Sequence, residues 1–163
     1  MMKKEDIEMD LIKTKKDKTQ VHILCKDHVP NFAMKNEFQT NTFSLKMNRL
    51  EIHEEEYYGY IIEEGGVFLC VDITIRNLLD QQLNLDKNDF LISYDSEGLF
   101  EPEDYFYVEN QLKDKIQLNK NEQITGKFVY IIANNSKKIA FKYYETYDDQ
   151  YPKEYRLRYQ IQF

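Results

Sequence analysis

Cysteine and histidine are the usual ligands of zinc in proteins, and this chain has few of them. Cys25 and His28 are separated by two residues, while His22 and His53 stand elsewhere. A zinc site needs about four converging ligands, usually in paired close spacings, and only one such pair exists. We therefore interpret these histidines as surface residues and predict no metal centre of this kind.

The two cysteines also lack the surroundings of a nucleophile. A cysteine nucleophile needs a histidine base and a third, orienting group. Cys70 lies inside an apolar stretch without a glycine-rich turn to expose it, so it is predicted to pack as a small core residue. A Cys25–Cys70 disulfide stays open, because it depends on Cα separation and on the redox compartment. With no serine nucleophile elbow, phosphate-binding loop or HExxH motif, we expect no enzyme activity and no cofactor.

Two acidic clusters offer oxygen ligands. Residues 51–64 contain six glutamates, and residues 95–109 contain six acidic side chains. Calcium binds several oxygens that a turn supplies, which gives an alternative hypothesis of a calcium site in the 95–104 region. Solvated loops that keep the domain soluble and its strand edges unpaired explain the same clusters. The ligands of the calcium alternative are Asp95, Glu97, Glu101 and Asp104.

Tyrosines stand among acidic residues in two stretches, 103–107 and 143–149. Tyrosine supplies rigid contact area, and the acids supply electrostatic steering, so these stretches are candidates for binding a protein partner. Tyrosines also cover sheet surfaces without any binding role. The candidate partner-binding residues are Glu103, Asp104, Tyr105, Tyr107, Tyr143, Tyr144 and Tyr147.

The elements that would position these residues are predicted to be β-strands. In Val67–Arg76 five aliphatic residues alternate with the other positions, a period of two that fits a strand and not a helix. The residues at the second face become polar after Cys70, which indicates that one end of this strand is covered on both faces. An alternation from Phe43 slips by one residue near Arg49, where we expect a bulge. Residues 155–163 predict a last strand with one wet face.

About seven such strands, separated by turn signals such as residues 95–98, predict two packed antiparallel sheets. The chain of 163 residues suits one domain, residues 21–163, preceded by a charged tail or tether over residues 1–20. A net charge of −7 without a basic patch argues against nucleic-acid binding. No apolar stretch is long enough for a membrane span.

Two groups of residues resemble a known family. The first is Val67–Asn77 with residues 90–92 and 95–98, and the second is residues 118–122 followed by Gly126–Ile132. Together they are similar to a bacterial immunoglobulin-like β-sandwich family of unknown function, common in secreted and lipid-anchored proteins of low-GC Gram-positive bacteria. The likeness covers roughly residues 42–145.

This resemblance implies an immunoglobulin-like sandwich and an accessory or interaction domain without enzyme activity. Two features depart from the family pattern: no lipid-attachment signal precedes the domain, and Asn121 replaces the usual turn glycine. Asn also adopts left-handed backbone geometry, so the turn is still expected. The expected location is the cell surface if an export segment has been removed, and the cytoplasm if Met1 is the native start.

Overall fold

Strands make up nearly all the regular structure of the protein. The computed structural model describes residues 21–24, 36–54, 56–104, 107–145 and 152–161. The expected tail over residues 1–20 lies outside the described residues, as do Cys25, Tyr105 and Tyr147. The strands are β1 (Val21–Leu24), β2 (Glu37–Gln39), β3 (Phe43–His53), β4 (Glu56–Tyr57), β5 (Tyr60–Ile61), β6 (Gly66–Asn77), β7 (Leu83–Asp86), β8 (Phe90–Tyr94), β9 (Glu97–Phe100), β10 (Lys115–Leu118), β11 (Gln123–Ala133), β12 (Lys138–Glu145) and β13 (Lys153–Ile161), with the 3-10 helix η2 (Lys87–Asp89) before β8.

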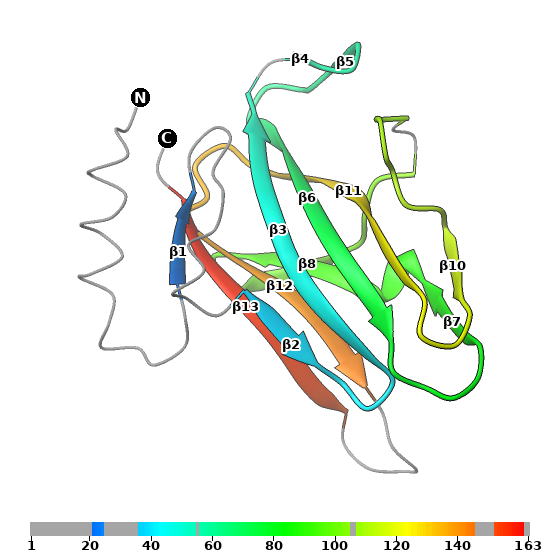
Figure 1. Cartoon of the computed structure of the whole chain (residues 1–163). Coiled ribbons are helices and arrows are strands. Elements are labelled where there is room, and N and C mark those ends of the chain that lie inside the picture. Colours follow the sequence, from blue (N-terminus) through cyan, green and yellow to red (C-terminus); the bar gives the residue numbers. More distant parts are fainter. Residues whose placement is uncertain (1–20, 25–35, 55, 105–106, 146–151, 162–163) are drawn as a thin grey trace.

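Two sheets face each other in a sandwich (Figure 1). One has the strand order β1-β13-β12-β8-β9, and the other β11-β6-β3-β2. The named strands run antiparallel to their neighbours except β1, which pairs in parallel with the end of β13 from Arg158 to Ile161. The predicted all-β, immunoglobulin-like sandwich of two sheets is confirmed, and β1 is a parallel addition to it.

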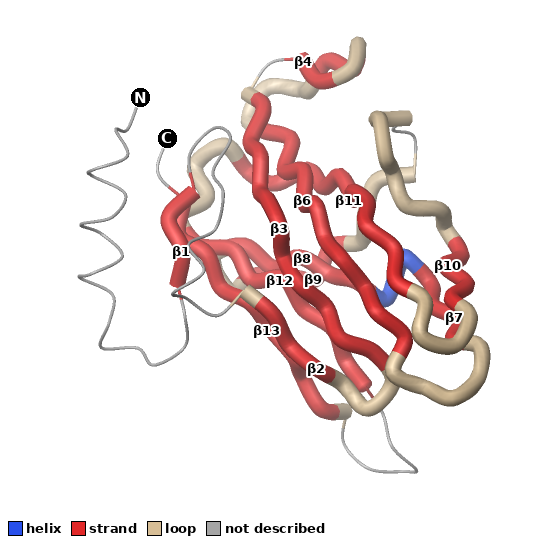
Figure 2. Tube along the Cα trace, viewed as in Figure 1, coloured by secondary structure: helices blue, strands red, loops and turns tan. Residues whose placement is uncertain are grey.

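Smaller elements complete the molecule (Figure 2). Strands β10 and β7 form a two-stranded sheet, and β4 and β5 form a hairpin that projects from one end of the sandwich. The described residues contain no helix that is long and apolar enough to cross a membrane.

The core lies between the two sheets and follows the alternation of the sequence. On β6, Val67, Leu69, Val71, Ile73 and Ile75 are all buried and belong to one hydrophobic cluster with side chains of the opposite sheet. Burying these aliphatic groups is the main stabilising contribution to such a fold. The predicted bulge in β3 is present, since its register with β6 shifts between positions 47 and 49.

A second, smaller apolar cluster covers the outer face of β6 at one end. Phe68, Cys70 and Val129 pack there under Tyr57 and Val108. This confirms the expectation that the start of β6 is covered on both faces. The Cys70 thiol is free and buried, and burial raises its pKa to about 11. A thiol that stays protonated at neutral pH is a poor nucleophile, as expected for a core residue.

Two tight turns use left-handed backbone conformations. Asp95 and Ser96 have φ angles of 51° and 61° between β8 and β9, a pattern typical of a two-residue hairpin turn. Asn121 has φ 63° in the turn before β11. Asn thus takes the left-handed position at which the resembling family has glycine, as predicted.

Candidate functional site

The acidic residues of the 95–104 region do not converge. The Asp95 carboxylate accepts hydrogen bonds from the backbone amides of Lys137 and Lys138, at 2.9 and 3.0 Å. Asp104 forms an ion pair with Lys87 at 2.6 Å. Among the residues that the structure describes, no three His, Cys, Asp or Glu side chains gather in a way that could hold a metal ion. The arrangement therefore gives no support to the calcium alternative.

Lys87 explains part of this acidic region. Its side chain is almost fully buried and its ammonium group contacts Asp104 and, at 3.1 Å, Asp114. Burial alone would lower the pKa of Lys87, but the hydrogen bonds to the two carboxylates outweigh it and raise the pKa. The lysine thus ties two points of the long connection between β9 and β10 to η2.

The candidate tyrosines lie in different environments. Tyr107 is 82% exposed and lines a shallow hollow of about 810 Å³ together with Asp104. Glu103 precedes Asp104 in the chain. Its backbone amide donates to the Val129 carbonyl of β11 at 2.8 Å, which fixes this residue to the sheet.

The second tyrosine stretch is partly structural. The Tyr143 ring packs against the core, with ring centroids 4.8 Å from Phe43 and 5.3 Å from Phe90. Tyr144 lies on the other face of β12, where its hydroxyl donates to Glu154 at 3.1 Å. Among the described residues of this stretch, Tyr144 is therefore the tyrosine on the outer face of β12.

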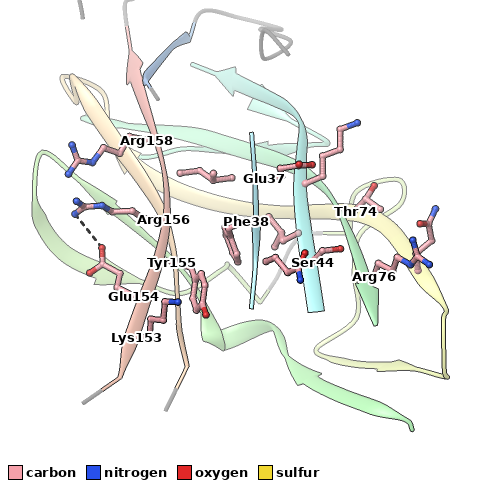
Figure 3. A pocket seen from close by; sticks show the side chains of 15 residues that line it. Glu37, Phe38, Ser44, Thr74, Arg76, Lys153, Glu154, Tyr155, Arg156 and Arg158 are labelled. Carbon is pink, nitrogen blue, oxygen red and sulfur yellow. Dashed lines mark hydrogen bonds and ion pairs between the residues drawn. The ribbon is translucent and has the colours of Figure 1, made fainter. Parts of the chain in front are cut away.

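A lateral groove of about 860 Å³ lies between β2 and β13 (Figure 3). Strand β2 ends its sheet and bonds to β3 through alternate residues, as in the bond from the Thr40 amide to the Phe43 carbonyl at 2.8 Å. In an antiparallel ladder the intervening residues direct their backbone groups the other way. Glu37 and Gln39 therefore point N–H and C=O groups away from β3, where no described strand pairs with them.

The first half of β13 has an open edge on the same side of the sandwich. The Ile161 amide donates to the Lys137 carbonyl at 2.7 Å. Every second residue of β13 counted back from Ile161 therefore directs its backbone groups toward β12. By the same alternation, Glu154 and Arg156 direct their backbone groups away from β12. Strand β1 covers this edge only from Arg158 onward. Within the part of the chain that the structure describes, two open strand edges thus border one groove.

Aromatic rings form the floor of the groove. The rings of Phe38 and Tyr155 stack with centroids 5.5 Å apart, and the Lys153 ammonium lies 4.9 Å from the Tyr155 centroid. Such contacts hold the two sheets together at their open side.

Glu145 fixes the position of β2 relative to β13. Its buried carboxylate accepts from the Asn41 amide at 3.1 Å and from the Thr42 and Tyr155 hydroxyls at 3.5 Å. Burial and, next, the Glu145 carboxylate raise the pKa of Tyr155. The turn after β2 is therefore anchored to the opposite sheet.

The groove is basic although the protein is acidic. Its lining carries five basic and two acidic side chains, against a net charge of −7 for the chain. Figure 3 shows Arg156 and Arg158 extending from β13 on the side away from β2. The basic side chains are Lys46, Arg76, Lys153, Arg156 and Arg158, and the acidic ones are Glu37 and Glu154.

This groove could not be predicted from the sequence, because its two walls are more than a hundred residues apart in the chain. The alternation of Arg156 and Arg158 with apolar residues marks a wet face of a strand. It does not reveal which strand lies opposite.

Two facing sheets with an open lateral groove define the class of the molecule as a β-sandwich domain. The chain belongs to the family described as a domain of unknown function (DUF4352), whose model matches residues 32–153. This confirms the resemblance noted from the strands and turns. No curated protein matches the chain.

Solved structures from low-GC Gram-positive bacteria share the fold. A candidate lipoprotein (ycdA) from Bacillus subtilis is 17% identical with a TM-score of 0.61, and the match covers 76% of this chain and 38% of that one. The yjhA protein from Bacillus subtilis is 14% identical with a TM-score of 0.57, covering 77% and 96%. A functionally unknown protein from Listeria monocytogenes is 10% identical with a TM-score of 0.55, covering 84% of each chain.

Proposed function

We propose that this chain is a non-enzymatic interaction domain that binds a protein partner. The observation that carries the proposal is the lateral groove. There Glu37 and Gln39 on one wall, and Glu154 and Arg156 on the other, turn outward backbone groups that pair with no described strand. An extended segment of another protein can add to such an edge as a further strand. Main-chain hydrogen bonds then give affinity, and the pockets beside the strand give specificity.

Substitutions that remove one outward N–H test this function. Gln39→Pro and Glu154→Pro remove that donor without removing a bond to the neighbouring strand, because both amides point away from it. Gln39→Ala and Glu154→Ala are the matched controls, since they remove the same side chains and keep the donors. Circular dichroism and thermal unfolding establish that each variant is folded.

The readout is cross-linking and capture of partners from the cell envelope with the wild-type domain and these four variants. We expect a partner that the wild-type domain and both alanine variants capture and that at least one proline variant loses. If both proline variants capture the partner as well as the wild-type domain does, the proposal is overturned. Loss on Tyr107→Ala instead would move the binding surface to the hollow beside Asp104.

We also propose that the domain works at the bacterial cell surface. The similarity in fold to a candidate lipoprotein supports this location. Antibody labelling of intact cells of the source organism, compared with permeabilised cells, tests it. Labelling only after permeabilisation would assign the domain to the cytoplasm.

A further inference from the structure

Basic side chains gather on the outer face of β12 and β13, next to the open edge of β13. Lys142 lies directly opposite Arg156 in the register of the two strands, and Arg158 is the next residue of β13 on the same face. Like charges directly opposite each other on neighbouring strands are destabilising. The fold therefore contains a repulsive pair on this face, although acidic residues outnumber basic residues in the chain as a whole.

Local acids relieve this repulsion only in part. Arg156 contacts Glu154 at 3.4 Å, with 42% and 32% of the two side chains exposed. Glu154 also accepts from the Tyr144 hydroxyl. An exposed ion pair of this kind contributes little to stability. A negatively charged ligand on this face would be attracted to Lys142 and Arg156 together.

Part of the edge of β13 beside these cations already pairs with a strand of the protein itself. Strand β1 pairs with β13 from Arg158 to Ile161, and the same edge is open among the described residues over Lys153–Leu157. A strand added there would alternate its side chains between the two faces of the sheet. On the outer face they would lie beside Arg156, and on the inner face beside the rings of Phe38 and Tyr155.

We propose that the open half of β13, Lys153–Leu157, binds an extended peptide in which acidic and apolar residues alternate. This rests on the proposed function and names its partner class. The acidic side chains meet Arg156, Arg158 and Lys142, and the apolar side chains cover the stacked rings of the groove. The outward backbone groups of Glu154 and Arg156 offer both donors and acceptors, which a peptide backbone matches and a simple polyanion does not.

Short synthetic peptides are the probes. The first alternates valine and glutamate, the second has glutamine in place of each glutamate, and the third carries the residues of the first in two blocks. We expect the alternating acidic peptide to bind most tightly, with an affinity that falls as salt is added. Equal binding of the glutamine peptide or the block peptide overturns the proposal. Binding of inorganic polyphosphate as tight as that of the alternating peptide also overturns it.

Variants locate the site. Arg156→Glu should weaken the alternating peptide by about tenfold or more, because it replaces an attraction with a repulsion on the outer face. Lys120→Glu is the matched control, since it makes the same change of charge at a turn residue that does not line the groove and is 57% exposed. Equal weakening by the two variants would mean that only net charge matters, against the proposal.

Nuclear magnetic resonance of the wild-type domain keeps the test independent of variant folding. Addition of the alternating peptide should shift the amide signals of Lys153–Leu157, and shifts confined to the region of Tyr107 would overturn the proposal. The two proposals fail separately. If the captured partner depends on Gln39 and the acidic peptide does not bind, the interaction function stands and this inference falls.

Discussion

The hydroxyl of Tyr130 joins the two sheets. It lies fully buried on β11 and donates to the Phe90 carbonyl on β8 at 2.8 Å. The sequence does not indicate that this hydroxyl finds a partner across the sandwich. A buried hydroxyl without a partner would be costly, so this bond allows a tyrosine where phenylalanine would otherwise be expected.

Tyr130→Phe should lower the free energy of unfolding by about 1 kcal/mol, because it leaves the Phe90 carbonyl without its donor. Urea unfolding followed by circular dichroism measures the change. Tyr144→Phe is the control, since its hydroxyl bonds to Glu154 at the surface and should change stability by less than about 0.5 kcal/mol. Equal effects of the two variants would contradict the structural role of the buried bond.

Tyr143 is the residue whose environment differs most from the sequence-based hypothesis. Because its ring packs against Phe43 and Phe90, burial raises the pKa of Tyr143 to about 12. The neutral phenol is favoured in the folded state. Keeping Tyr143 neutral therefore contributes fully to the free energy of unfolding below pH about 10, the ordinary pKa of tyrosine. This contribution is lost as the pH rises through about 12.

Tyr143→Phe should make stability fall less steeply between pH 10 and 12, since phenylalanine keeps the ring and cannot ionise. Some slope should remain, because burial also raises the pKa values of Tyr130 and Tyr159. Thermal unfolding across this pH range is the measurement. An unchanged slope would mean that Tyr143 ionises alike in the folded and unfolded chain.

At the scale of elements, long strands were predictable and the shortest were not. The ten residues Val67–Arg76 alternate so regularly that β6, and the cover on both faces at its first half, follow from the sequence. Strand β2 has three residues with one buried side chain, Phe38, which is too little pattern to distinguish from a loop. Since β2 forms one wall of the groove, the site could not be predicted either.

Strand order is the other unpredictable quantity. The position of β12 beside β8, and of β1 beside half of β13, depends on contacts between residues far apart in the chain. Alternation identifies which side chains of a strand face the core. It does not identify which strand lacks a neighbour, and the proposed site consists of such edges.

The open edges predict a pattern of hydrogen exchange. The amides of Gln39 and Arg156 point outward and should exchange quickly, whereas those of Phe38 and Leu157 bond within the sheets and should be protected. Exchange resolved by nuclear magnetic resonance compares these neighbours within one sample. Slow exchange at Gln39 and Arg156 would show that something already covers the edges.

At the scale of the whole molecule, one core joins both sheets. Residues of β3, β6 and β11 share a single buried cluster with residues of β8, β12 and β13. Such a domain should unfold in one cooperative transition. Circular dichroism and tyrosine fluorescence should report the same midpoint in urea, and separated midpoints would mean that the two sheets unfold independently.

The projecting hairpin of β4 and β5 carries a consequence for how a partner approaches. It extends from one end of the sandwich, within the glutamate-rich stretch of residues 51–64, while β13 begins at the other end with Lys153 (Figure 1). The glutamates beside the hairpin repel an acidic partner, and the basic side chains that line the groove attract it. The two forces together favour an approach in which the groove faces the partner. Alignment would then precede contact, and added salt would slow association more than it speeds release.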